Sequence, residues 1–291
     1  MCIGFNLLTM NLKHKIGVRL NRENAIVFLK YSSVQPRFVE ILAEEWQNIG
    51  GYWNNILEKL ASRYKLYVRS EELNLGGLGE LNMDKLISLK KFLSTYDIKI
   101  LSGNIGFTSC KGFHTYTSMP IEYSSETLTN VAKRVNYIQN LLEQYIVIEP
   151  LVQLNKMQNS IDETTFFNQL TKKTGCSYAL NIESVFLNED LKTENFDFKT
   201  FLPLKNIAFI HLNQQLINND NSNILGFYEK VLRELKPLPI IIDTCFNSEF
   251  TLSISEDLQL IDVLTSNIWK SHAKQRNYKI ANSDSQAMLW K

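Results

Sequence analysis

Three side chains that could do chemistry stand at or near the ends of apolar runs. Glu149 closes YIVIE, His211 lies in IAFIHL, and Asp243 closes PLPIIID. Burying such groups without partners is costly, so each needs a counter-ion, a hydrogen bond or a metal ion. Imidazole suits Fe, Zn or Mn, and carboxylates shift the preference toward Mn or Fe. Together the three could hold one divalent cation, although a single His at such a place more often makes hydrogen bonds.

Three further apolar runs end in residues that suit a metal poorly. These residues are Arg69, Asn104 and Asn181. Arginine keeps its proton in proteins and therefore cannot coordinate a metal, whereas Asn181 could offer an amide oxygen. No Ser/His/Asp or Cys/His arrangement can be placed, so the catalytic residues remain unknown at this level. The other histidines lie in a polar loop or near the chain ends and are not expected as ligands: His14, His114 and His272.

These groups belong to eight short runs that read as β-strands. Most of the runs are continuously apolar, as expected of parallel strands that are buried on both faces by helices. The runs are Lys15–Leu20, Phe38–Leu42, Leu66–Ser70, Ile98–Gly103, Tyr145–Glu149, Tyr178–Ile182, Ile207–Leu212 and Pro239–Thr244.

Helical patterns separate the strands. The clearest is Ser124–Glu143, which has one apolar stripe and Ser125 as its expected N-cap. Another begins at Ser160 with Glu163 at the capping-box spacing, and Gly175 is its expected C-terminal stop. A short helix is expected after Asp197, and the other helices are Tyr52–Tyr64, Met83–Tyr96, Asn223–Leu235 and Ser255–Ser271.

Strict alternation of eight strands with helices predicts a single (β/α)8 TIM barrel over residues 15–270. An N-terminal extension, 1–14, precedes it, and a basic C-terminal tail, 271–291, follows it. The structural alternative is a doubly wound sheet, but no glycine-rich turn follows the first strand. Active groups of such barrels project from the carboxyl ends of the strands, which places the residues above at one mouth.

Composition argues against several partners and compartments. The net charge is +1, so no global field draws the chain to nucleic acid or to an acidic membrane. The four cysteines include no CxxC pair, which favours a reduced, cytoplasmic protein. The N-terminus lacks the pattern of a signal peptide, and no apolar run approaches the roughly 20 residues of a membrane span.

The order of several segments resembles a known family. In order, the segments are IGVRL, FVEILAEEW with Gly50-Gly51, RYKLYV leading to LNLGG, YSSETLTNVAKRVNYIQNLL, YIVIE, TGCSYALNIES, IAFIHL and PLPIIID. Together they resemble the multinuclear non-haem iron-dependent oxidases, which include the methanobactin-biosynthesis iron oxidase. The resemblance implies an xylose-isomerase-like barrel. It also implies relatives that hold two or three irons and oxidise cysteines of a ribosomally made precursor peptide, usually with a small leader-binding partner protein.

The resemblance implies that some of the family's metal-ligand positions keep a suitable residue in this chain and that others are replaced. Glu149 stands at the bridging glutamate, His211 at the first His of the family's IHLxGH run, and Asp243 where the family has Glu. Four other ligand positions are changed: Arg69, Asn104 and Gln215 stand in place of histidines, and Asn181 stands in place of an aspartate.

These replacements lead to a functional hypothesis. We expect a degenerate homologue in ribosomal peptide biosynthesis that does not assemble the di-iron centre and needs no cofactor. It would act as a scaffold for a precursor peptide or a leader-binding partner protein, beside an active homologue. Arg69 is expected to replace the lost cation by pairing with Glu149 or Asp243.

Two alternatives stay open. One is an oxidase or isomerase that uses a single iron at Glu149, His211 and Asp243, helped by Asn181. The other is an intact oxidase that recruits further ligands, and its candidates are Glu71, Glu183 and Cys245.

Overall fold

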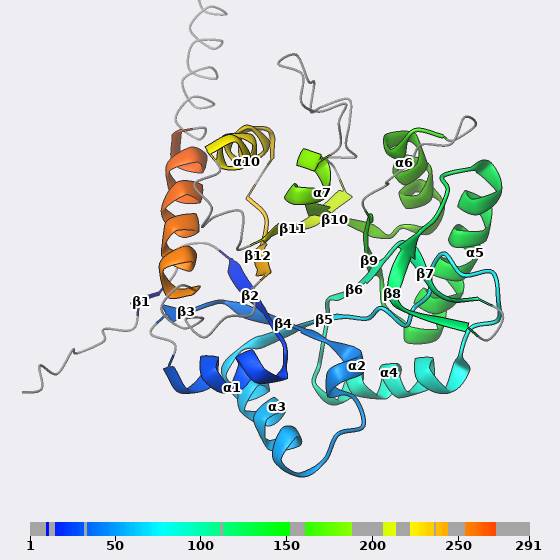
Figure 1. The fold of residues 1–291 in the computed structure, drawn as a ribbon, viewed down its shortest axis with the longest axis horizontal. Coiled ribbons are helices and arrows are strands. Elements are labelled where there is room, and N and C mark those ends of the chain that lie inside the picture. The colour runs from blue at the N-terminus through cyan, green and yellow to red at the C-terminus, as the bar shows by residue number, and fades with distance from the viewer. Residues whose placement is uncertain are drawn as a thin grey trace, which may run out of the picture.

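The computed structural model describes residues 10–11, 15–31, 34–110, 113–151, 161–187, 206–213, 222–235, 237–243 and 254–271 (Figure 1). Eight parallel strands close into a barrel in the order β10-β11-β12-β2-β4-β5-β6-β9. The predicted TIM barrel is therefore confirmed, and each predicted run overlaps one strand. The strands are β2 (Ile16–Leu20), β4 (Phe38–Leu42), β5 (Lys65–Arg69), β6 (Leu101–Asn104), β9 (Ile146–Glu149), β10 (Ser177–Asn181), β11 (Ile207–Asn213) and β12 (Ile240–Asp243).

Helices form a ring around the barrel (Figure 1). They are α1 (Arg22–Tyr31), α2 (Ala43–Trp46), α3 (Gly51–Arg63), α4 (Met83–Thr95), α5 (Ser125–Leu142), α6 (Glu163–Thr174), α7 (Ile182–Leu187), α10 (Ser222–Glu234) and the helix over 254–271. None of the helices in these ranges is long and apolar enough to cross a membrane.

Two small sheets lie outside the barrel. β1 (Met10–Asn11) pairs with β3 (Val34–Gln35), and β7 (Gly106–Cys110) forms an antiparallel hairpin with β8 (Phe113–Pro120). The hairpin was not predicted, because its sequence lacks a regular alternation of apolar and polar residues. The tail from residue 272, the short helix after Asp197, and the residues Ser160, Gln215 and Cys245 lie outside the described residues.

Helix ends follow local capping chemistry, with two corrections to the sequence prediction. Ser124, not Ser125, is the N-cap of α5, and its side chain accepts a hydrogen bond from the Thr127 N–H at 3.1 Å. Asp162 caps α6 in the same way, so that helix begins at Glu163. Gly175 ends α6 with a φ of 70°, as predicted for a glycine in the left-handed region.

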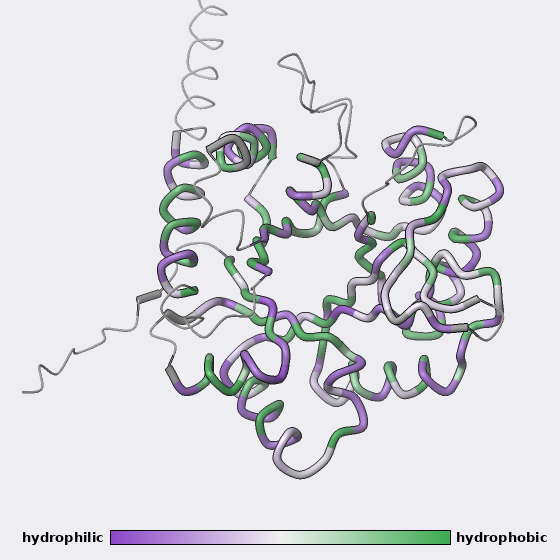
Figure 2. Tube along the Cα trace, viewed as in Figure 1, coloured by the Kyte–Doolittle hydropathy of each residue, from purple (hydrophilic) through white to green (hydrophobic). Residues whose placement is uncertain are grey.

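The core has two layers of apolar contact. The larger one lies between the strands and the helices, which explains the green, apolar stretches on many strands in Figure 2. The smaller one fills the barrel interior and contains Phe38, Val147, Ala179, Phe209 and Ile241.

Gly17 belongs to the same interior level. A side-chain carbon at this position would lie 2.2 Å from the Phe38 ring, so glycine makes room for that ring. Phe38 in turn stacks on Tyr67, with ring centroids 4.0 Å apart. The barrel is thus packed shut below its mouth, as an eight-stranded barrel requires.

Candidate functional site

Along each strand, every second side chain faces the barrel interior. We call the interior apolar cluster the apolar plug, and the residues two positions beyond it form the next level toward the mouth. In this chain that level is polar on every strand. We call it the polar layer: Arg19, Glu40, Arg69, Ser102, Glu149, Asn181, His211 and Asp243. Strand order sets it, because β12 pairs with β2 and β2 pairs with β4, which brings residues 243, 19 and 40 side by side.

Arg19 is the hub of one side of the polar layer. Its Nε donates to Glu40 Oε2 at 2.6 Å, and its Nη1 donates to Asp243 Oδ2. Its Nη2 lies 3.1 Å from His211 Nε2. Glu40 is fully buried, with 1% of its surface exposed, so its carboxylate depends on this guanidinium for compensation.

His211 lies between two carboxylates. Its Nδ1 is 3.0 Å from Glu149 Oε1, and its Nε2 is 3.4 Å from Glu40 Oε2. Phe209, from the apolar plug, packs against its ring. Burial lowers the pKa of this imidazole, but Glu149 and Glu40 raise it, and the net direction is upward.

Arg69 lies on β5, two strands away from the Arg19 strand β2. Its Nη1 donates to Glu149 Oε2 at 3.4 Å, and its Nη2 donates to Glu71 Oε1 at 3.3 Å. The predicted pairing of Arg69 with a mouth carboxylate is confirmed, and Glu149 is the partner. Asp243 is instead paired with Arg19, which was not predicted.

Glu149 has the densest set of partners. Asn181 Nδ2 donates to its Oε1 at 2.9 Å, in addition to the His211 and Arg69 contacts. Burial raises the pKa of this carboxyl, but His211 and Arg69 hold it well below its usual range. For Glu40 the balance is similar: burial raises the pKa, Arg19 and His211 lower it, and the result is about 2.

The structure brings four predicted site residues together: Glu149, His211, Asn181 and Arg69. Asp243 joins them through Arg19. Asn104 lies opposite Glu149 in the β6–β9 register and is 6% exposed, and its Oδ1 has no hydrogen-bond partner among the described residues.

Besides Ser102, two charged members of the polar layer, Arg19 and Glu40, were missed by the sequence prediction. Each is a charged residue inside an otherwise apolar strand, IGVRL and FVEIL, and that signal could have identified them. A charge in such a position is stable only with a partner at the same level of the barrel.

The two further candidate ligands among the described residues, Glu71 and Glu183, hydrogen-bond to protein groups. Glu71 pairs with Arg69, and Glu183 accepts a hydrogen bond from Asn213 at 3.1 Å. His114 is exposed on β8, away from the polar layer. Cys176 is buried, and burial raises the pKa of its thiol to about 11, which keeps it unreactive.

Protein groups engage the atoms of the polar layer that could bind a metal ion. Both ring nitrogens of His211 already face protein groups, and a guanidinium N–H lies against Nε2. Both oxygens of Glu149 accept hydrogen bonds from protein donors, and Asp243 is paired with Arg19. Within the described residues, no group of three or more His, Cys, Asp or Glu side chains is arranged to hold a metal ion.

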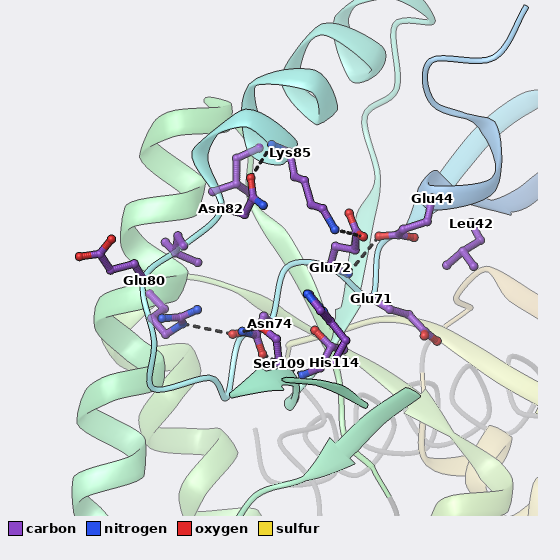
Figure 3. Close-up of a pocket in the computed structure, with 14 residues that line it drawn as sticks. Leu42, Glu44, Glu71, Glu72, Asn74, Glu80, Asn82, Lys85, Ser109 and His114 are labelled. Atoms are coloured by element: carbon purple, nitrogen blue, oxygen red, sulfur yellow. Dashed lines mark hydrogen bonds and ion pairs between the residues drawn. The ribbon is translucent and has the colours of Figure 1, made fainter. Parts of the chain in front are cut away.

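A cleft of about 680 Å³ opens beside the mouth (Figure 3). Its wall includes Glu71, whose pairing with Arg69 connects the cleft to the polar layer. Glu44 and Glu72 line one side, and Asn74 and His114 lie across from them in the view of Figure 3. The lining therefore combines several carboxylates with the apolar side chains of Leu42, Leu81 and Leu86.

A family model described as "RiPP precursor modification enzyme MbnB/TglH/ChrH" matches residues 15–262, which is the whole barrel. The chain belongs to this family. The family consists of enzymes that modify ribosomally synthesised precursor peptides, and the resemblance noted in the sequence is thereby confirmed.

Relatives within the MbnB/TglH/ChrH family are similar to this chain at low sequence identity. A UPF0276 protein of Shewanella loihica is 26% identical over 201 residues, covering 68% of this chain and 71% of the relative. A UPF0276 protein of Shewanella sediminis is 22% identical over 259 residues, covering 86% of this chain and 92% of the relative.

Solved structures confirm the fold of this family member. The apo 3-keto-D-glucoside 4-epimerase of E. coli superposes with a TM-score of 0.54 at 11% identity, covering 86% of this chain and 99% of the enzyme. An L-ribulose 3-epimerase superposes with a TM-score of 0.53 at 9% identity, covering 93% of this chain and 98% of the epimerase. At such identities the likeness shows an xylose-isomerase-like TIM barrel and nothing about the reaction.

Proposed function

We propose that this family member does not assemble a multinuclear iron centre and serves peptide biosynthesis as a binding scaffold. It would hold a precursor peptide or a small leader-binding partner protein, beside an active homologue. The observation that carries the proposal is the pair of guanidinium groups, Arg19 and Arg69, among the carboxylates of the mouth.

Charge balance supports this proposal. The polar layer has three carboxylates, and two arginines together with the imidazole of His211 offset them. A divalent cation about 4 Å from one guanidinium would meet a repulsion of about 8 kcal/mol at an effective dielectric constant of 20. Each additional iron would add to that repulsion, and arginine cannot relieve it by losing a proton.

One observation favours a second candidate function. Glu149 and His211 lie in contact and, with Asp243, could bind a single iron in an oxidase or isomerase. That site would require Arg19 to leave both Asp243 and His211, because its N–H groups occupy the positions that the metal needs.

The scaffold role needs a surface that accepts a chain. The cleft beside the mouth supplies one, since its volume is typical of sites for small ligands or a few residues of peptide. The family's work on precursor peptides is the reason to propose a peptide as the occupant.

Metal counting separates these functions. The protein is purified without oxygen, supplied with ferrous iron, and analysed for iron per chain. The scaffold proposal predicts no stoichiometric iron, whereas two or more irons per chain would refute it. One iron that disappears in His211→Ala, but stays in the matched control His114→Ala, would establish the mononuclear alternative.

A further inference from the structure

Arg134 is a buried cation without a carboxylate partner. It lies on α5, lines the cleft, and is 8% exposed. Its Nε donates to the Asn74 carbonyl at 3.1 Å and its Nη1 donates to the Gly79 carbonyl at 2.6 Å. Its Nη2 has no hydrogen-bond partner, and no carboxylate of the described residues pairs with it.

A buried guanidinium normally has a carboxylate as its partner, because its charge loses the stabilisation of water. Two backbone carbonyls replace only part of that stabilisation, and burial accordingly lowers the pKa of Arg134. The remaining hydrogen-bonding capacity is for an anion. Arg134 lines the cleft, so an anion bound there would reach the buried Nη2 after a small movement of the side chain.

The surroundings of Arg134 are held in place before any ligand arrives. Asn74 has a positive φ of 46°, and its side chain accepts from Thr108 N–H at 2.8 Å and donates to Ser109 at 3.1 Å. Asn130, on α5, donates to the Gly77 carbonyl at 3.1 Å. The loop between β5 and α4 is therefore fixed to both the β7–β8 hairpin and α5, which lowers the entropy cost of binding.

The charge of the side chains that line the rest of the cleft affects which kind of anion can bind. Glu44, Glu71, Glu72 and Glu80 also line the cleft, and Glu44 Oε2 has no partner among the described residues (Figure 3). Lys85 pairs with Glu72 and Arg69 pairs with Glu71, so cations compensate only part of this negative charge. The carboxylates would therefore repel a phosphate dianion more than a carboxylate monoanion. We propose that the cleft recognises a peptide by binding one of its carboxylates at Arg134.

The carboxylate could be a chain terminus or an acidic side chain, which offer the same chemistry to a guanidinium. This inference rests on the proposed function for the choice of a peptide, while the recognition site itself depends only on Arg134 and the cleft. Iron content therefore tests the proposed function without testing this site, and the two can fail separately.

The test follows the Nε–H signal of Arg134 by NMR in the full-length protein, assigned by its loss in Arg134→Lys. Three peptides are titrated: acetyl-Ala-Ala-Ala with a free carboxylate, acetyl-Ala-Glu-Ala amide, and acetyl-Ala-Ala-Ala amide. We expect the Arg134 signal to shift with at least one acid, and the acid that shifts it identifies the source. That acid should bind about tenfold tighter than the amide, the cost of losing a charged partner.

Two further measurements complete the design. Inorganic phosphate should bind more weakly than the acidic peptide. Glu72→Gln should reduce this difference in affinity, whereas the control Glu126→Gln, on the exposed start of α5, should leave it unchanged. The proposal is overturned if neither acid shifts the signal at about 10 mM, above the millimolar Kd expected for so few contacts. It is also overturned if the amide shifts the signal equally or phosphate binds tightest. The peptide comparisons use the unchanged site, and if Arg134→Lys folds poorly, the signal is assigned through its bonds to the Arg134 backbone in the unchanged protein.

Discussion

Removal of Arg19 should destabilise the fold through the carboxylate that it leaves behind. In Arg19→Met, Glu40 stays buried at 1% exposure and loses the donor at 2.6 Å. The pKa of Glu40 lies at about 2 instead of 4.5. At about 1.4 kcal/mol per unit, that difference corresponds to roughly 3 kcal/mol of stabilisation. Breaking a buried ion pair from one side costs about 3–5 kcal/mol, so we expect a loss of about 3 kcal/mol.

Urea unfolding at pH 7, followed by circular dichroism, measures this loss. The matched control is Lys85→Met, which breaks the exposed pair with Glu72 and should cost less than about 1 kcal/mol. A double variant with Glu40→Gln should recover most of the loss, because the buried charge is gone. If Arg19→Met costs no more than the control, or the double variant recovers nothing, the compensating role assigned to Arg19 is wrong.

Three further predictions concern pH, packing and reactivity. Glu40 has a lowered pKa, so its contribution to stability is present above about pH 4.5 and is lost as the pH falls toward 2. His211 has a raised pKa, so its contribution is present below about pH 6.5 and is lost at higher pH. Urea unfolding should therefore show greatest stability between about pH 4.5 and 6.5, with no decline on the alkaline side in His211→Gln. Gly17→Ala places a carbon 2.2 Å from the Phe38 ring and should cost about 1–3 kcal/mol by the same assay, so a neutral effect would contradict the packed plug. Cys176 should resist iodoacetamide in the native protein at pH 8 and react after denaturation, and peptide mapping by mass spectrometry would reveal native labelling.

The barrel could be predicted because its signal is local. Most of the strands belong to short apolar runs, and the helices between them show stripes of period 3.6. The alternation of the two then indicates the class of fold. Strand ends were less certain: the run Ile98–Gly103 begins in the structure at Leu101 and extends to Asn104. The caps at Ser124 and Asp162 were displaced because several neighbouring residues can accept the same N–H.

The network in the mouth could be predicted only in part. Tips of neighbouring strands converge in any such barrel, which is why Arg69 could be expected near Glu149. The contact between Arg19 and Asp243 joins residues that are 224 positions apart and exists because β12 closes the sheet onto β2. The carboxylate that pairs with an arginine depends on the height of both residues along the axis of the closed barrel. The sequence alone does not show this height. Gln215 and Cys245 lie outside the described residues, so their predicted roles stay predictions.

The central claim is that Arg19 and Arg69 occupy the mouth in place of iron. Its most direct test is a crystal structure of protein loaded with ferrous iron without oxygen, with anomalous data collected at the iron edge. We expect no anomalous peak in the polar layer, and Arg19 and Arg69 still in contact with Glu40 and Glu149. Two peaks bridged by Glu149, with the guanidiniums turned away, would contradict the claim.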